Sequence, residues 1–369
     1  MRIVIDGRML GPRWTGIGLY TSKLIENLAT IDRDNEYIVL VDQENFQNWT
    51  PPGSNIKKVL APYKIYSFSE QFILPFKIRQ LKPDLVHFLH NVPILYRGKR
   101  VVIVHDTTMV DFDLAPKGLT KALKYKLKRQ AMLLVFRATA SANMVITPTQ
   151  ATKDRLLALL RGKLTADRIT VVYEAIDVPD TKPRPISVDP PKLLYVGTFF
   201  PYKNLQLVIQ AWPRILIKHP GASLTIIGDT PRFRESIHQA VRRLGVARSI
   251  LLPGFVSNEE REKAYRTASL FIFPSLSEGF GLPPLEAMAG GLPVVAAEAS
   301  CLPEVLGDGA VYFDPHDPKD LAEKVNDLLD HPEKLAKMQE QGYQRLGQFS
   351  WGKMATETLE VYKGLAKPD

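Results

Sequence analysis

Two glutamates flank a glycine-rich turn in the segment Ser277-Glu278-Gly279-Phe280-Gly281-Leu282-Pro283-Pro284-Leu285-Glu286. The glycines let the backbone approach a ligand closely, and the prolines fix φ for the first turn of a helix expected to continue through residue 289. Amides at such a helix start carry partial positive charge and stabilise a phosphate. Glu286 can then accept two ribose hydroxyls, while Glu278 faces the group that the phosphate carries. The segment predicts a phosphate and sugar site, although an unrelated loop acid and helix acid would give the same pair.

A cation for this chemistry stands in the segment Tyr195-Val196-Gly197-Thr198-Phe199-Phe200-Pro201-Tyr202-Lys203-Asn204-Leu205. A lysine at this point can stabilise the negative charge of a phosphate group. Lys203 is predicted to have that role. A solvated lysine at a helix start is the alternative.

Two further candidates stand in the first half of the chain. His105 follows the apolar run Val101-Val102-Ile103-Val104, so it lies at the carboxyl end of a predicted strand, where α/β folds bind ligands. A purely structural pairing of His105 with Asp106 is the alternative. Gly16 belongs to a glycine loop predicted ahead of a helix at 19–28. A dinucleotide site is disfavoured there, because Thr21 replaces the third glycine of the fingerprint.

Short β-branched runs alternate with helical patterns along both halves of the chain, which indicates an α/β fold with parallel sheets. Helices are predicted at 205–217, 320–329 and 351–364. Strands are predicted at 3–5, 37–41, 85–88, 101–104, 144–147, 170–173, 193–196, 224–227, 250–252, 270–273 and 294–296. The proline-rich segment 179–191 cannot join a central strand. We therefore predict domains at 1–178 and 192–350, a linker at 179–191, and a C-terminal helix at 351–369.

Composition favours a two-domain enzyme outside the membrane. The chain has 369 residues, and no apolar run reaches the ~18 residues needed to span a bilayer. The start of the chain reads as a strand without a signal peptide, so we expect a cytoplasmic protein. A single cysteine, Cys301, excludes an internal disulfide. His87 and His90 lack a third ligand in pattern, so no zinc site is expected.

The stretch 274–315 resembles the signature of retaining GT-B glycosyltransferases of family 4. Beyond the glycine-rich segment, the match includes Gly290-Gly291-Leu292-Pro293 and Leu302-Pro303-Glu304-Val305. The resemblance extends over essentially the whole chain. It implies two Rossmann-like domains facing each other across a cleft, with a C-terminal helix that crosses back to the first domain.

The resemblance also implies roles for residues of this chain. Glu278, His105 and Lys203 would be catalytic. The donor-binding residues would be Gly16, Thr198, Lys203, Val256, Glu278, Phe280, Gly281, Leu282 and Glu286. Family members commonly have Arg-Lys-Asn where this chain has Tyr202-Lys203-Asn204, which puts a second basic contact in doubt. Neither a metal nor another cofactor is expected, because basic side chains and amides would neutralise the diphosphate.

The predicted function is retaining transfer of a hexose from GDP-mannose or a UDP-hexose to a hydroxyl of a glycan or lipid-linked acceptor. Two alternatives stay open. One is a sugar-nucleotide epimerase or glycan phosphorylase on the same architecture. The other is a non-catalytic sugar-nucleotide binding protein.

Basic residues gather in a helix predicted within 117–137, and no acidic residue occurs from Leu114 to Lys153. The basic residues Lys117, Lys121, Lys124, Lys126, Lys128 and Arg129 alternate with leucines. This pattern predicts contact with an anionic membrane surface or a lipid-diphosphate acceptor, hence a peripheral protein at the inner face of the membrane. A solvated basic helix is the alternative. Nucleic acid is disfavoured, because no recognition fold accompanies the charge.

Overall fold

The computed structural model describes residues 1–90, 92–114, 118–179 and 185–366. The chain divides into two compact units, one formed by Met1–Glu174 with Ser350–Asp369 and the other by Ala175–Phe349. The segment 179–191, predicted as a linker, lies in the second unit, and residues 180–184 of it are outside the described residues.

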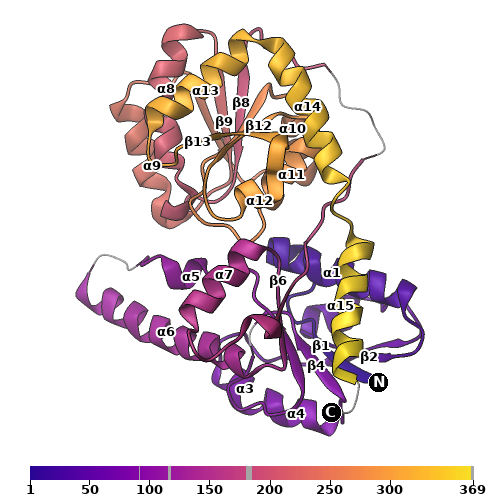
Figure 1. Ribbon diagram of the computed structural model, residues 1–369. Helices are drawn as coiled ribbons and strands as arrows, with labels where there is room; N and C mark the ends of the chain where they lie inside the picture. The colour runs from indigo at the N-terminus through magenta and orange to yellow at the C-terminus, as the bar shows by residue number, and fades with distance from the viewer. Residues whose placement is uncertain (91, 115–117, 180–184, 367–369) are drawn as a thin grey trace. The chain divides into compact units, whose positions relative to one another are not determined.

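The first unit is built on a parallel sheet of seven strands in the order β3-β2-β1-β4-β5-β6-β7 (Figure 1). Most apolar residues of its strands are buried, as expected for a parallel sheet. The strands are β1 Arg2–Asp6, β2 Glu36–Val41, β3 Ile56–Leu60, β4 Leu85–Phe88, β5 Arg100–Ile103, β6 Met144–Thr147 and β7 Ile169–Val171. The helices are α1 Thr15–Ile31, α2 Gln43–Asn48, α3 Phe68–Phe72, α4 Leu74–Gln80, α5 Thr108–Asp111, α6 Leu119–Ala138, α7 Gln150–Leu159 and α15 Trp351–Ala366.

The second unit repeats the architecture with six parallel strands in the order β10-β9-β8-β11-β12-β13. The strands are β8 Lys192–Val196, β9 Ser223–Ile227, β10 Ile250–Gly254, β11 Leu270–Phe273, β12 Val294–Ala297 and β13 Ala310–Phe313. The helices are α8 Leu205–Lys218, α9 Pro231–Arg243, α10 Asn258–Thr267, α11 Leu282–Ala289, α12 Leu302–Leu306, α13 Pro318–Asp330 and α14 Pro332–Leu346. Both sheets reverse their strand order once, between β1 and β4 and between β8 and β11. Ligands of open α/β sheets bind at such reversals.

The predicted α/β fold with two Rossmann-like sheets is confirmed, with three differences. Strands β3 and β13 were not predicted. Helix α1 begins at Thr15, so the predicted loop around Gly16 is instead the first turn of the helix. Gly18 lets this first turn pack against the preceding segment, because a Cβ on Gly18 would lie 2.0 Å from the carbonyl oxygen of Gly11. That two domains face each other across a cleft stays a prediction.

Helix α15 belongs to the first unit although it ends the chain, and it lies beside α1 (Figure 1). Its Tyr362 is fully buried, and the hydroxyl lies 2.6 Å from Nδ1 of His87 in β4. Burial lowers the pKa of His87 to about 3, so the ring is neutral in the core. His87 is therefore a packing residue that secures the C-terminal helix.

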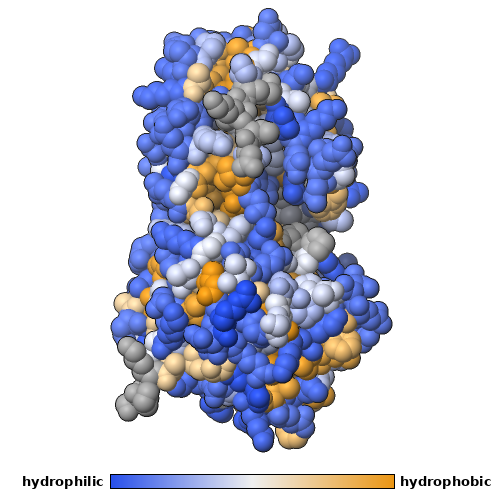
Figure 2. Space-filling model, turned by 90° about the vertical axis from the view of Figure 1, so that its right-hand side faces the viewer, coloured by the Kyte–Doolittle hydropathy of each residue, from blue (hydrophilic) through white to orange (hydrophobic). Residues whose placement is uncertain are grey.

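The surface carries apolar residues in separate patches. Figure 2 shows a face on which hydrophilic residues predominate and hydrophobic residues gather in a few places. Within the described ranges, no helix is both long and apolar enough to cross a membrane.

Candidate functional site

The glycine-rich segment joins strand β11 to helix α11 as the sequence predicts. Gly281 is the N-cap of α11 and has φ of 92°, a conformation that glycine adopts without strain. No side chain of Gly281 can cap the helix, and Leu282, Pro283 and Pro284 form its first turn. The backbone at Phe280, Gly281 and Leu282 thus stands at the start of a helix, where partial positive charge favours an anion.

Lys203 and Glu278 come together at the reversal point of the second sheet. Lys203 follows β8 and Glu278 follows β11, the two strands between which the order reverses. The Nζ of Lys203 lies 2.5 Å from Oε1 of Glu278, and their side chains are only 15% and 12% exposed. Two of the predicted catalytic residues therefore form one largely buried ion pair.

Hydrogen bonds from neighbouring segments hold this pair in place. The carbonyl of Tyr202 accepts a 2.8 Å hydrogen bond from the amide of Leu276, which ties the Lys203 loop to the Glu278 loop. Asn204 turns the chain into α8 with φ of 55°, and its side chain donates to the carbonyl of Pro315 at 2.8 Å. The hydroxyl of Ser300 donates to the carbonyl of Glu278 at 2.9 Å. The pair is thus positioned by three separate segments.

Glu286 lies one turn into α11, in a different group of side chains. Its Oε2 accepts a 3.0 Å hydrogen bond from the hydroxyl of Tyr265 and lies 4.0 Å from Nε of Arg261. Burial raises the pKa of Glu286, while Arg261 and the bond from Tyr265 oppose that rise. Burial also raises the pKa of Tyr265 well above its usual value, so it is a hydrogen-bond donor here. Sequence reasoning missed Tyr265 and Arg261, whose spacing of four on α10 places them on one helix face.

Thr198 and Val256 follow β8 and β10, on the same edge of the sheet. Both are half-buried, and the carbonyl of Thr198 accepts a 2.8 Å hydrogen bond from Tyr195. The turn after β9 reaches this edge because Gly228, with φ of 118°, passes against Gly197. A Cβ on Gly228 would lie 2.1 Å from the carbonyl oxygen of Gly197. Gly228 therefore allows the two backbone segments to pass close to each other at this end of the sheet.

In the first unit, His105 follows β5 and is fixed at both ring nitrogens. Its Nδ1 lies 3.0 Å from Oε1 of Glu174, and its Nε2 lies 3.1 Å from the carbonyl oxygen of Leu89. Tyr20 packs edge-on against the ring at 5.1 Å between centroids. The partner of His105 is thus Glu174, and Asp106 instead caps the amide of Thr108 at 2.8 Å. The sequence alternative of a His105–Asp106 pair is wrong, because the two side chains bond to different partners.

His105 lines a cavity of about 150 Å³ within the first unit. Polar lining comes from His90, Asp106 and Arg129. Apolar lining includes Met132, Leu133 and Phe136 on helix α6. Burial lowers the pKa of His90 to about 4, so this ring is neutral. Gly16 lies in the neighbouring first turn of α1, and Ile17 contributes to the cavity wall.

Among the residues that the structure describes, no three histidine, cysteine or carboxylate side chains are grouped to hold a metal ion. His87 and His90 belong to separate contacts, with Tyr362 and with Tyr66. Metal independence of the reaction stays a prediction.

Two family models match the chain in succession. The model for glycosyltransferase family 4 matches residues 14–179, and the model for glycosyl transferases group 1 matches residues 179–345. The chain is 26% identical to O-antigen chain mannosyltransferase B of Escherichia coli, over 98% of this chain and 100% of that protein. It is 30% identical to glycogen synthase of Mycobacterium tuberculosis, over 77% of this chain and 69% of that protein.

The fold has solved counterparts. The structure of Alr3699/HepE from Anabaena in complex with UDP and glucose matches with a TM-score of 0.72 at 18% identity, over 99% of this chain and 100% of that one. These similarities agree with the two parallel sheets and with the resemblance seen at the glycine-rich segment. This chain belongs to the GT-B glycosyltransferases of family 4.

Proposed function

We propose that this glycosyltransferase moves a hexose, with retention of configuration, from a nucleoside-diphosphate sugar to a hydroxyl of a glycan or lipid-linked acceptor. The contact of Lys203 with Glu278 at 2.5 Å carries the proposal. An ammonium group suits a departing diphosphate, and a carboxylate suits the positive charge that develops on the sugar. GDP-mannose is the first candidate donor because of the similarity to an O-antigen mannosyltransferase. A UDP-hexose is the second, because a structure of similar fold holds UDP and glucose.

The reaction breaks the bond between the anomeric carbon and the phosphate oxygen, and the electron pair leaves with the diphosphate. The acceptor hydroxyl attacks from the face that the diphosphate leaves, and its proton passes to the departing phosphate. Lys203 and the backbone at Phe280, Gly281 and Leu282 hold the phosphate charge, without a metal ion. Glu278 accepts hydrogen bonds from the sugar and stabilises the oxocarbenium-like centre. When the donor binds, Lys203 therefore has to exchange its ion pair with Glu278 for one with the diphosphate.

Glu286 binds the ribose of the donor in this proposal. Its carboxylate has one oxygen bonded to Tyr265, and that bond fixes its direction. Val256 and Thr198 contribute backbone contacts to the base and the phosphates. A role of Gly16 at the distal phosphate stays a prediction of the family resemblance.

His105 and the cavity of the first unit serve the acceptor. The contacts to Glu174 and Leu89 fix the ring, so it can orient a hydroxyl at the cavity wall. Arg129 suits a phosphate on the acceptor, and the apolar side chains of α6 suit a lipid.

Helix α6 also gives the protein a surface for anionic membranes. Leu123, Leu127 and Leu134 are 59%, 65% and 55% exposed among lysines. Lys117, the first basic residue of the predicted set, lies outside the described residues. Contact through 117–137 would place the enzyme as a peripheral protein at the cytoplasmic face. Binding to anionic vesicles but not to neutral ones is expected, and equal, salt-independent partition to both would contradict it.

A thermal-shift panel of GDP, UDP, ADP and their common sugar conjugates tests the proposed function. Ligands that bind the folded state raise its apparent stability. A selective shift by one nucleotide family supports the donor site and identifies the base. The absence of any shift would count against the proposed function.

A further inference from the structure

In the segment between β3 and β4, a charged residue faces the core and apolar residues face the solvent, which is the reverse of an ordinary surface helix. Glu70 in α3 is 0% exposed, whereas Phe68 and Phe72 in the same helix are 73% and 51% exposed. The pattern continues with Ile73, which joins α3 to α4, and with Phe76 in α4; they are 47% and 61% exposed. A surface helix normally turns its apolar face to the core and its charges to water. The four exposed apolar residues define an apolar face, called here the α3–α4 face.

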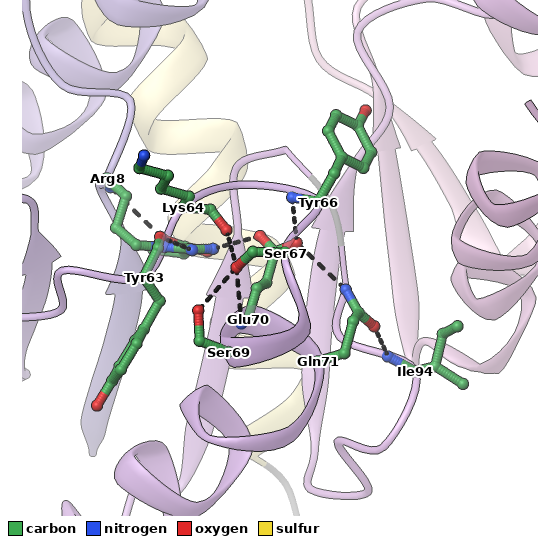
Figure 3. Close-up of polar contacts among 10 residues, drawn as sticks. Arg8, Tyr63, Lys64, Tyr66, Ser67, Ser69, Glu70, Gln71 and Ile94 are labelled. Carbon is green, nitrogen blue, oxygen red and sulfur yellow. Dashed lines mark hydrogen bonds and ion pairs between the residues drawn. The ribbon is translucent and has the colours of Figure 1, made fainter. Parts of the chain in front are cut away.

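A buried ion-pair network fixes this orientation (Figure 3). Arg8 donates from Nη2 to Oε1 of Glu70 at 2.8 Å and to Oδ2 of Asp6 at 2.6 Å. The other oxygen of Glu70 accepts from the amide of Tyr66 at 2.7 Å and from the side chain of Gln71 at 3.2 Å. A buried carboxylate is stable only when it is paired in this way. Rotating α3 to bury its phenylalanines would expose or unpair Glu70, so the outward apolar face is a fixed feature.

The exposed rings are also organised. Phe68 and Phe72 stack with centroids 4.1 Å apart and planes inclined by 22°. On the other side of α4, Leu74, Pro75 and Ile78 are buried against the domain. The α3–α4 face is therefore additional to the core contacts of α4. Contiguous exposed apolar residues of this kind mark sites of interaction.

The exposed charges in the segment that carries the α3–α4 face have one sign. From Thr50 to Pro83, Glu70 is the only acidic residue in the sequence, and it is buried on Arg8. Lys64, Arg79 and Lys82 of the same stretch are exposed. The segment thus combines an apolar, aromatic face with exposed positive side chains. A second copy of the chain would bring two sets of positive side chains together, whereas an anionic surface would complement them.

We propose that the α3–α4 face docks onto an anionic lipid bilayer, with its phenylalanines inserted at headgroup depth. Aromatic side chains favour the membrane interface, and lysine and arginine favour anionic headgroups. Tyr66, at the start of this segment, lines the same cavity as Arg129 and Leu133 of α6. The docking surface therefore borders the cavity assigned to the acceptor. The proposal rests on the proposed function and extends it, because docking on a bilayer would bring the cavity to a lipid-linked acceptor.

Vesicle co-sedimentation tests the docking without any need for turnover. The full chain is mixed with vesicles of neutral lipid or of neutral lipid with phosphatidylglycerol. The triple variant F68S/F72S/F76S should lose at least about tenfold in partition to anionic vesicles, equal to ~1.4 kcal/mol. The matched control I217S changes a residue 83% exposed on α8 and should partition like the wild type. Unchanged partition of the triple variant, or an equal loss in the control, would overturn the proposal.

A second measurement does not depend on the folding of the triple variant. F72W places an indole in the α3–α4 face, and brominated lipid chains quench an inserted indole. Quenching beyond that of the wild-type tryptophans supports insertion, and quenching equal to the wild type would overturn it. If the wild type self-associates through this face and the triple variant is monomeric, the docking partner is another copy and the lipid proposal is wrong. Donor thermal shifts are read separately, so a failed donor site is distinguished from failed docking.

Discussion

Replacing Lys203 by alanine should weaken both the stability and the chemistry of the second unit. Lys203 and Glu278 are 15% and 12% exposed, so the change leaves a largely buried carboxylate without its cation. Breaking a fully buried pair costs about 3–5 kcal/mol, and an exposed pair contributes up to about 1 kcal/mol. Because this pair is largely but not fully buried, we expect a loss of about 1–3 kcal/mol in the free energy of unfolding, between these two limits. Without the cation on the leaving diphosphate, kcat should fall about 10²–10³-fold.

The assay is release of nucleoside diphosphate at saturating donor, combined with denaturant unfolding of the donor-free protein. K203R keeps the positive charge and should recover part of the lost kcat. The matched control K218A removes the lysine of an exposed ion pair, in which the side chains of Lys218 and Asp330 are 50% and 32% exposed. That variant should change neither kcat nor stability measurably. A K203A protein with wild-type kcat at saturating donor would refute the role given to Lys203.

Three further predictions concern other parts of the chain. Because burial raises the pKa of Glu286, its contribution to stability is present at low pH and lost as pH rises through that pKa. Donor binding needs the ionised carboxylate, so donor affinity should fall on acidification, starting at a higher pH than for an ordinary glutamate. E286Q should bind donor at least about tenfold more weakly and with no such fall in affinity on acidification, as measured by calorimetry. Y362F removes a 2.6 Å partner from buried His87 and should lower the unfolding free energy by about 1–3 kcal/mol in denaturant titrations; unchanged stability would argue against docking of α15 through this bond. G228A places a Cβ 2.1 Å from a carbonyl oxygen and should prevent normal folding as judged by circular dichroism, whereas G245A, with nothing within 4 Å, should lose only about 1–2 kcal/mol.

The local patterns were sufficient for most strands and for the centre of the site. Parallel buried strands are continuous apolar runs, and the glycine and proline pattern marks the start of α11. Strand β3 was missed because Lys57 and Lys58 interrupt its apolar pattern at the edge of the sheet. The start of α1 was placed too late, because glycines disfavour helix and the packing of Gly18 on Gly11 is a tertiary contact.

The partners of the site residues could not be read from the sequence. Glu174 reaches His105 across 69 positions, and Tyr265 reaches Glu286 across 21. Such pairs depend on how strands and helices are arranged in space, and no local periodicity encodes that arrangement. The buried position of Glu70 was hidden for the same reason, because its partner Arg8 is 62 positions away.

The anomeric configuration of the released sugar tests the central claim most directly. GDP-α-mannose or UDP-α-glucose is mixed with a stoichiometric concentration of enzyme, so that hydrolytic release of the sugar outpaces mutarotation, and the anomeric proton is followed by NMR. Retention through Glu278 and Lys203 predicts that the nucleoside diphosphate and the α-anomer appear first, and that K203A suppresses both. First appearance of the β-anomer, or no consumption of any donor in the panel, would contradict the account.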